Sequence, residues 1–393
     1  MNFVALKMLI GDRAKYFGII MGIAFASLLI TQQSSIFVGL MTRTFGFVSD
    51  TRQPDVWVMD PKVQFIDDIK PLQDTQLLRV RGIPGVEWAM PLYKGLIKAR
   101  LPDGAFQTCN VIGVDDSTLI AGPGEMVEGK LEDLRRADSV IVDIVGATGK
   151  LAKPAPLGED GKPIPGAKPI PLKLGDTLEL NDRRAVVVGF CNVSRTFQSQ
   201  PVVYTTYSRA TQFAPRERKL LSFVIAKAKP GVDPKALARN IRDETGLDAL
   251  TSDEFSWRTV TYFMKYTGIP INFGIAVVLG FLVGTAIAGQ TFYNFTLDNL
   301  KQFGALKAMG AGNFRLLRMI LLQALIVGVI GYCIGIGAAS TFGLLAGKSE
   351  LAFRLLWQTL VVTGVAVTLI CILASLISIQ RVMRLEPAIV FKG

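Results

Sequence analysis

The sequence predicts an α-helical membrane protein with four transmembrane helices and a large mixed α+β extracytoplasmic domain between helices 1 and 2. Half of the 393 residues are hydrophobic and only 19% are charged, a balance typical of membrane proteins. Four runs carry no charged residue, and each exceeds the ~20 residues that a helix needs to cross a bilayer. The long segment between the first two runs, residues 43–265, is large enough for a folded domain.

The four uncharged runs are the predicted transmembrane helices, at residues 16–42, 266–297, 319–347 and 355–380. The first run has an alternative interpretation as a signal peptide, because "AFA" at Ala24–Ala26 resembles a cleavage site. Apolar sequence resumes after it as "IFVGLM", whereas the apolar part of a signal peptide is usually ~7–15 residues long. We therefore favour a membrane span.

The distribution of lysine and arginine predicts the orientation in the membrane. Basic residues are concentrated in the N-terminal segment 1–15, the connection 298–318 and the tail 381–393, with few acidic residues beside them. The positive-inside rule places these three segments, and so both termini, in the cytoplasm. The domain at 43–265 and the short loop 348–354 then lie outside, so the expected protein is a multi-pass membrane protein.

Composition also excludes several classes of chemistry. The chain has no histidine, so it has no Ser-His-Asp triad, no Cys-His nucleophile and no histidine-ligated metal. Its Gly-Lys pairs lack the G-x-x-x-x-G-K-[ST] spacing of a phosphate-binding loop. Most of the net charge of +11 comes from the three predicted cytoplasmic segments and little from the outer domain, so no folded domain has the concentrated basic face that nucleic-acid binding needs, and we expect no such binding. We assign no catalytic residue, no metal and no cofactor to this chain.

The extracytoplasmic domain shows strand patterns separated by turns, and one amphipathic helix at residues 234–246 that Gly246 ends. The Pro/Gly-rich stretch Lys153–Lys173 predicts an exposed loop, largely polyproline-like or mobile. Cys109 and Cys191 leave two possibilities open, a disulfide or two free cysteines buried in strands, and we favour the second. The predicted strands lie within residues 55–60, 83–101, 106–115, 173–180, 183–194, 201–207 and 220–229.

Small residues recur at four-residue spacing in two predicted spans: Gly280, Gly284 and Ala288 in the second, and Gly331, Gly335, Ala339 and Gly343 in the third. Such stripes let helices pack closely, either within the chain or against a second protomer. The spans hold no ionisable side chain, which argues against an ion-driven transporter. Gln32 and Gln33 in the first span would line a vestibule or protein contact, or else lie in the outer interface.

The connection 298–318 contains a short basic helix with an apolar stripe. Leu300, Phe303, Leu306 and Met309 recur every three residues, and Lys301 and Lys307 lie between them. The stripe predicts either a helix on the inner leaflet, with both lysines at lipid headgroups, or a helix docked into a cytoplasmic partner.

The segment "LDNLKQFGALKAMGAGNFRLLRMILLQALIVGVIGYCIGIG" and the tail "QRVMRLEPAIVF" resemble the FtsX-like permeases of MacB, lipoprotein-release and DevC-type ABC transporters. The order of one span, a large outer domain and three spans is similar too. The resemblance implies a coupling helix at 298–311, with Leu300, Lys301, Phe303, Leu306, Lys307 and Met309 against a separate ATPase subunit that binds ATP and Mg.

The same resemblance implies further partners and a function. It implies a second permease protomer, a periplasmic membrane-fusion adaptor and an outer-membrane channel. The expected function is that of a type VII permease subunit, which exports or extracts a substrate from the periplasm or outer leaflet. The alternative is an FtsX-like mechanotransmitter that regulates a cell-wall hydrolase without transport. A third relative, the peptide sensor of antibiotic resistance, resembles this chain less because it usually has more spans.

Overall fold

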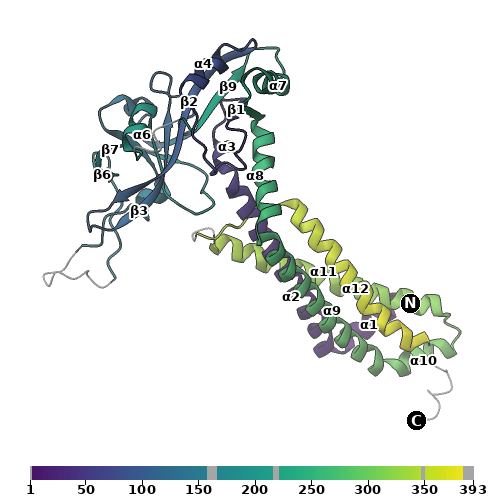
Figure 1. Cartoon of the computed structure of the whole chain (residues 1–393). Helices are drawn as coiled ribbons and strands as arrows, with labels where there is room; N and C mark the ends of the chain where they lie inside the picture. The colour runs from purple at the N-terminus through teal and green to yellow at the C-terminus, as the bar shows by residue number, and fades with distance from the viewer. Residues whose placement is uncertain (1, 157–165, 216–220, 347–349, 384–393) are drawn as a thin grey trace. The chain divides into compact units, whose positions relative to one another are not determined.

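The computed structural model describes residues 2–156, 166–215, 221–346 and 350–383 (Figure 1). The chain forms two compact units. Residues 1–40 and 267–393 make up one, which we call the membrane unit, and residues 41–266 make up the other, which we call the α/β unit. Each unit is described by itself below.

The membrane unit is helical. Within the described residues, four of its helices are long and apolar enough to cross a membrane, which confirms the four predicted spans. Two short helices lie at one end of the unit, together with the N-terminus (Figure 1). The long helices are α2 (Arg13–Thr44), α9 (Ile269–Asp298), α11 (Asn313–Ala346) and α12 (Trp357–Met383), and the short ones are α1 (Asn2–Gly11) and α10 (Leu300–Ala308).

The connection predicted at residues 298–318 is shorter than expected. Helix α9 ends at Asp298, α10 follows after one residue, and α11 already begins at Asn313. Arg315 and Arg318 therefore lie on the first turns of a spanning helix and not in a loop. Of the predicted tail 381–393, α12 takes in residues up to Met383, and residues 384–393 lie outside the described part of the chain.

The N-terminal segment 1–15, for which the sequence analysis proposed no structure, contains helix α1. Ala5, Met8 and Leu9 are buried in the core of the membrane unit. The side-chain nitrogen of Gln323 on α11 donates a 2.8 Å hydrogen bond to the carbonyl oxygen of Ala5. Lys15, at the start of α2, forms an ion pair with Asp298 at the end of α9. These contacts join α1 to α11 and the start of α2 to the end of α9.

The small-residue stripes of α9 and α11 both pack on α2 of the same chain. A Cβ atom at Gly284 would lie 2.3 Å from the Cβ of Ala26, and one at Gly335 would lie 2.6 Å from the carbonyl oxygen of Ala24. Gly280 and Gly331 also face α2, and Ala288 and Ala339 are buried. The stripes therefore serve packing within the chain, and the alternative that one of them faces a second protomer does not fit this arrangement.

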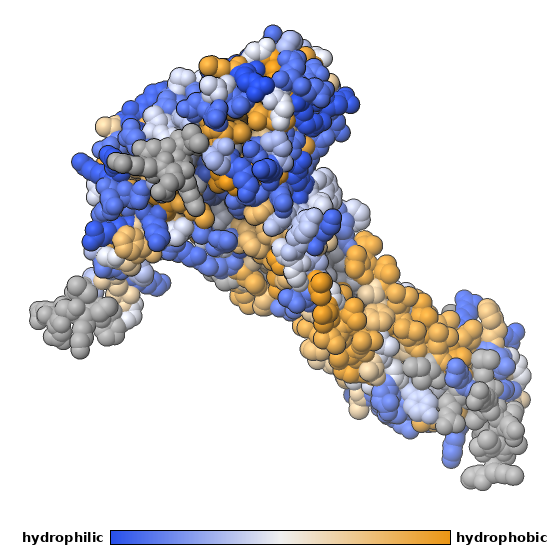
Figure 2. Space-filling model, in the orientation of Figure 1, coloured by the Kyte–Doolittle hydropathy of each residue, from blue (hydrophilic) through white to orange (hydrophobic). Residues whose placement is uncertain are grey.

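The remaining surface of the spanning helices is apolar. Figure 2 shows hydrophobic residues gathered over the membrane unit and mostly hydrophilic residues over the α/β unit. Large exposed apolar side chains include Ile271, Val278 and Leu282 on α9 and Val361 and Val365 on α12. A surface of this kind is unfavourable in water but matches the hydrocarbon core of a bilayer.

The α/β unit is built on a twisted mixed sheet (Figure 1). Ten strands among the described residues follow the order β10-β1-β9-β2-β3-β8-β5-β7-β4, with β6 pairing to β2 and β7. The strands are β1 (Val56–Met59), β2 (Val86–Arg100), β3 (Phe106–Val114), β4 (Glu125–Glu128), β5 (Ser139–Asp143), β6 (Thr177–Leu180), β7 (Arg183–Asn192), β8 (Val202–Thr206), β9 (Phe223–Ala228) and β10 (Asp248–Thr251).

The long strand β2 joins two halves of the sheet. Its first part, Val86–Leu92, pairs with β9, and its second part, Tyr93–Arg100, pairs with β3. Short helices cover the halves, and a longer one, α8, is the last element of this unit in the chain. The helices are α3 (Gly46–Asp50), α4 (Thr75–Arg81), α5 (Ile144–Thr148), α6 (Tyr207–Phe213), α7 (Pro234–Thr245) and α8 (Ser252–Tyr266), with a 3₁₀ turn at Leu131–Arg135.

Most predicted elements of this unit are present. Every predicted strand is found, and α7 begins at its capping residue Asp233 and ends at Gly246, whose φ of +70° is left-handed. The ends of the stretch Lys153–Lys173 are fixed, contrary to expectation: Lys153 and Ile170 form a β-bridge and Leu172 is buried. Residues 157–165 of that stretch lie outside the described residues.

Cys109 and Cys191 are both buried and free, as favoured from the sequence. They lie on β3 and β7, and strands β8 and β5 separate these two strands in the sheet. Three strand spacings of ~4.8 Å each keep the two cysteines much farther apart than a disulfide allows.

Candidate functional site

Helix α10 is an extension of α9 that the core of the membrane unit holds in place. Only Asn299 separates the two helices, and its buried side chain donates a 2.8 Å hydrogen bond to the carbonyl oxygen of Phe295. Phe303 has no exposed surface and belongs to the same buried cluster as Phe292 and Phe295. Leu306 packs against the same cluster. Helix α10 is therefore fixed to the end of α9.

This burial corrects one expectation. Phe303 and Leu306 were expected to anchor α10 in a partner, but both contact the chain's own core, and Leu300 and Lys307 are half-buried. The apolar stripe at three-residue spacing is the face that α10 turns towards its own bundle. Periodicity identifies an apolar face and not the surface that covers it.

The exposed part of this region is the turn between α10 and α11. Every residue from Ala308 to Arg315 is exposed except Ala311. Met309 is 76% exposed and Phe314 is 78% exposed, although both side chains are large and apolar. Lys301, at the start of α10, and Arg315, next to Phe314 in the chain, are also exposed. We call these four residues the α10–α11 surface.

The turn itself has a defined geometry. The N–H of Ala311 donates to the carbonyl oxygen of Leu306 (3.0 Å), and the N–H of Gly310 donates to that of Lys307 (3.1 Å). This pattern, with Gly310 at a φ of +91°, is a Schellman motif, in which the residue after the helix adopts a left-handed conformation. The motif sets the direction in which the chain leaves α10 and so positions Met309 and Phe314.

Sequence reasoning missed Phe314. Its neighbours Leu316, Met319, Ile320 and Gln323 form the buried face of α11. Phe314 does not lie on this buried face. A large apolar residue outside the buried pattern of α11 was therefore the sequence signal that could have identified it. Gln32 and Gln33 are half-buried on α2, beside the buried residues Thr31 and Ser35. A vestibule at these glutamines remains an expectation.

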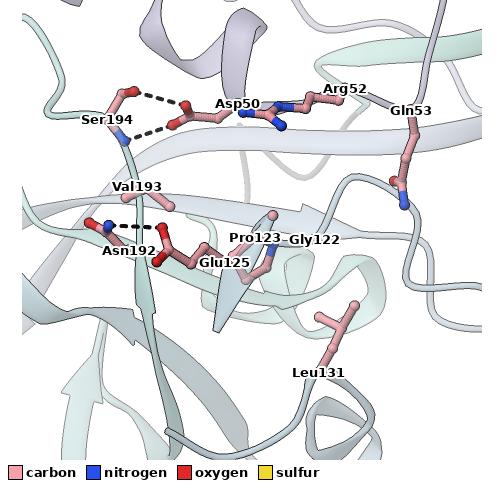
Figure 3. Close-up of a pocket in the computed structure, with 11 residues that line it drawn as sticks. Asp50, Arg52, Gln53, Gly122, Pro123, Glu125, Leu131, Asn192, Val193 and Ser194 are labelled. Atoms are coloured by element: carbon pink, nitrogen blue, oxygen red, sulfur yellow. Dashed lines mark hydrogen bonds between the residues drawn. The ribbon is translucent and has the colours of Figure 1, made fainter. Parts of the chain in front are cut away.

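The α/β unit has a polar cleft of about 660 Å³ beside β4 (Figure 3). Asp50 accepts hydrogen bonds from the backbone N–H and the hydroxyl of Ser194, at 2.7 and 2.8 Å. The side-chain amide of Asn192 donates to Glu125 at 2.9 Å. Figure 3 shows Arg52 and Gln53 along the same cleft. The lining includes the acidic residues Asp50 and Glu125 and the basic residue Arg52. It can make polar contacts, but it does not show the arrangement of a catalytic site.

Two loops of the α/β unit hold the helix α8. Phe65 stacks on Tyr262 with the ring centroids 4.4 Å apart, and Phe197 lies 4.7 Å from Phe263. The segment that carries Phe197 also holds α3, because it contains Ser194, the partner of Asp50. The chain thus enters and leaves this unit through helices that the same loop contacts.

The buried titratable groups of the α/β unit have structural partners. Burial raises the pKa of Asp143, although its carboxylate accepts hydrogen bonds from the N–H groups of Val202 and Gly146, each at 2.7 Å. Burial also raises the pKa of Cys109 to about 12, which keeps the thiol protonated. Among the described residues, no group of three or more Cys, Asp or Glu side chains could hold a metal ion.

Comparison with known proteins gives two family matches that together cover most of the chain. The MacB-like periplasmic core domain matches residues 16–244, and the FtsX-like permease C-terminal domain matches residues 267–387. The first match covers more than half of the chain.

Curated relatives agree with these matches. An uncharacterized ABC transporter permease of Mycobacterium tuberculosis is 25% identical over 223 residues, which are 56% of this chain and 58% of that protein, less than two thirds of its length. A second one from the same species is 23% identical, over 82% of this chain and 80% of the relative.

Among solved structures, the periplasmic region of MacB from Actinobacillus actinomycetemcomitans is 15% identical, with a TM-score of 0.36 over 56% of this chain and 96% of that one. The extracellular domain of YknZ from Gram-positive bacteria is 12% identical, with a TM-score of 0.32 over 50% of this chain and 98% of that one. Taken with the order of spans and the α/β unit between the first two, the family matches show that the chain belongs to the FtsX-like ABC transporter permeases with a MacB-like periplasmic core domain.

Proposed function

We propose that the chain is the membrane subunit of a type VII ABC transporter in the bacterial inner membrane, with both termini in the cytoplasm. A separate ATPase subunit binds ATP and Mg and docks on the α10–α11 surface. A second permease protomer completes the complex. The α/β unit faces the periplasm, where its movement exports or extracts a substrate with the help of a membrane-fusion adaptor and an outer-membrane channel.

One observation carries the contact with the ATPase. Met309 and Phe314 are large, apolar and exposed, and they lie on a turn whose other side is fixed to the spanning helices. Exposed aromatic and Met side chains with a basic rim are typical of the centre and edge of protein interfaces. Because α10 is packed against Phe292 and Phe295 of α9, force applied at this turn reaches a spanning helix without a flexible linker.

The docking is tested by Phe314→Asp. We expect the ATP-binding-cassette subunit, identified by mass spectrometry, to be lost from complexes purified out of native membranes, because a charge replaces an apolar anchor at the centre of the contact. Phe106→Asp is the matched control: Phe106 is 66% exposed on β3 of the α/β unit and should leave the subunit bound. Wild-type recovery of the ATPase with Phe314→Asp would contradict docking at this surface.

Transport is tested separately from docking. Proteins that co-purify with the intact complex should include a membrane-fusion adaptor if the complex exports its substrate through an outer-membrane channel. A cell-wall hydrolase in place of the adaptor would instead support the mechanotransmitter function. The result for Phe314→Asp does not depend on which of these two partners is found.

A further inference from the structure

A groove runs along the membrane unit between α11 and α12. It has a volume of about 510 Å³. Its floor consists of the small or buried residues Ala324, Gly328, Val367 and Cys371, and its rims include Leu325 and Val329, each 55% exposed. Both helices have the length and hydropathy of membrane spans, so the groove opens towards lipid.

The polar atoms in the groove already have partners within the chain. The hydroxyl of Tyr332 donates to the carbonyl oxygen of Leu360 at 3.0 Å, and the hydroxyl of Thr368 donates to that of Gly364 at 2.8 Å. No charged side chain lines the groove. Its occupant therefore needs apolar surface and no hydrogen-bonding group at this depth.

The length of the groove fits one leaflet. From Leu321 to Tyr332, α11 advances by 11 residues, or ~16 Å at 1.5 Å per residue. The hydrocarbon core of a bilayer is ~30 Å thick, so the groove extends through about half of it. A lipid acyl chain has this length, whereas a spanning helix of a second copy would need a surface through both leaflets.

A cation precedes the groove residues on the same face of α11. Arg318 precedes Leu321 by three residues and Leu325 by seven, so all three share one face of α11. Arg318 is exposed and lies near the end of the spanning helix, where the lipid headgroups are expected. A guanidinium group binds phosphate through paired, charge-assisted hydrogen bonds.

We propose that the α11–α12 groove is a phospholipid-binding site, in which one acyl chain lies between the helices and Arg318 binds the headgroup phosphate. The site is separate from the α10–α11 surface and does not depend on the ATPase. A lipid held there fills the crevice between the third and fourth spans and becomes part of the packing of the membrane unit.

The test titrates palmitoyl-oleoyl phosphatidylglycerol into the delipidated full-length protein, and native mass spectrometry measures the dissociation constant of the first bound lipid. Gly364→Leu fills the groove: a Cβ atom there has Tyr332 as its nearest neighbour at 3.6 Å, an ordinary contact. We expect binding to be weakened on the order of tenfold. Gly337→Leu is the control on α11, since a Cβ atom there meets nothing within 4 Å. It should bind like the wild type.

Arg318→Gln separates the headgroup contact from the groove. We expect it to remove the preference for phosphatidylglycerol over a diacylglycerol with the same chains. If Gly364→Leu prevents folding, Leu325→Ala on the exposed rim should weaken binding in its place. Wild-type affinity in both groove variants, or an equal loss in Gly337→Leu, would overturn the proposal. Disulfide-linked dimers formed by Leu325→Cys in membranes would also overturn it, because a second copy would then occupy the groove.

Discussion

At the scale of single residues, the position of the α10–α11 surface depends on Gly310. Its φ of +91° is a conformation that residues with a Cβ atom rarely adopt, and a left-handed non-glycine residue costs ~1–2 kcal/mol. Gly312 lies two residues away, has an ordinary φ, and a Cβ atom there meets nothing within 4 Å. The two glycines of "MGAGN" therefore have different roles.

We expect Gly310→Ala to lower the thermal stability of the purified permease and to reduce recovery of the ATPase. An alanine at this φ would strain the turn that presents Met309 and Phe314. Gly312→Ala should change neither property. Melting temperature and co-purification measure the two effects. Equal behaviour of both variants would show that the left-handed turn does not position the surface.

The two cysteines of the α/β unit give a second prediction. Thiol reactivity requires the thiolate, and burial raises the pKa of both Cys109, to about 12, and Cys191. A rise from pH 7 to pH 9 stays below the raised pKa of Cys109, so a maleimide should label neither cysteine in the folded protein. Intact mass after labelling counts the modified cysteines.

The control for this experiment is Phe106→Cys, on the same strand as Cys109 but at an exposed position. It should be labelled within minutes under conditions that leave Cys109 unmodified. With Cys333 and Cys371 of the membrane unit replaced, unfolding in guanidinium should make all three remaining thiols reactive. Labelling of Cys109 in the folded protein at the rate of the control would contradict its burial.

At the scale of elements, α2 packs closely against two spanning helices, because α9 and α11 both have glycines at their contacts with it. Gly284→Leu places a side chain where a Cβ atom alone would lie 2.3 Å from Ala26, so the helices must separate. Overpacking of this kind costs ~1–3 kcal/mol or more. We expect loss of monodisperse protein in size-exclusion chromatography and loss of transport.

Gly274→Leu on the same helix is the control, because a Cβ atom at Gly274 meets nothing within 4 Å. It should be expressed and purified like the wild type. Normal assembly of Gly284→Leu would show that α9 does not approach α2 as closely as the structure indicates.

Which elements can be predicted follows from the strength of their patterns. The spans were predictable because each is a long apolar run without charge, and β7 and β9 because apolar residues dominate them. Strand β4, "EMVE", was missed: it lies at the edge of the sheet and is largely exposed, so it has no buried face to leave a pattern. Helix α1 was missed because one face packs on α11 and the other is also apolar, which removes the amphipathic signal.

The sequence predicted where the candidate site lies in the chain, but not which of its residues are exposed. The short helix with Met309 near its end lies where the sequence placed it. Phe303 and Leu306 pack into the core of the membrane unit, which also includes residues of α1, α2, α11 and α12 that are distant in sequence, so the pattern of α10 alone could not show what covers this face. A local pattern shows that a face is apolar, and the tertiary structure decides what it contacts.

At the scale of the whole molecule, the proposed function requires the α/β unit and the α10–α11 surface to lie on opposite sides of the membrane. The chain order supports this, because an odd number of spans separates the α/β unit from each of these segments. Helix α2 alone lies between it and the N-terminal segment, α9 alone lies between it and α10, and α9, α11 and α12 lie between it and the C-terminal tail. The concentration of basic residues near α10 and the N-terminus gives the direction. Both features are properties of the sequence order and hold whatever the relative placement of the two units.

The arrangement is tested by two cysteines introduced into a chain whose four native cysteines are replaced. Phe106→Cys lies on the α/β unit and Asn313→Cys on the α10–α11 turn, and both positions are exposed. In intact spheroplasts, a membrane-impermeant maleimide should label only Phe106→Cys, because the bilayer separates Asn313 from the reagent. After permeabilisation both should be labelled to the same extent, which shows that Asn313→Cys is reactive in itself. Labelling of Asn313→Cys before permeabilisation would place the α10–α11 surface outside the cell, where no ATPase could dock on it, and would refute the topology and the proposed function together.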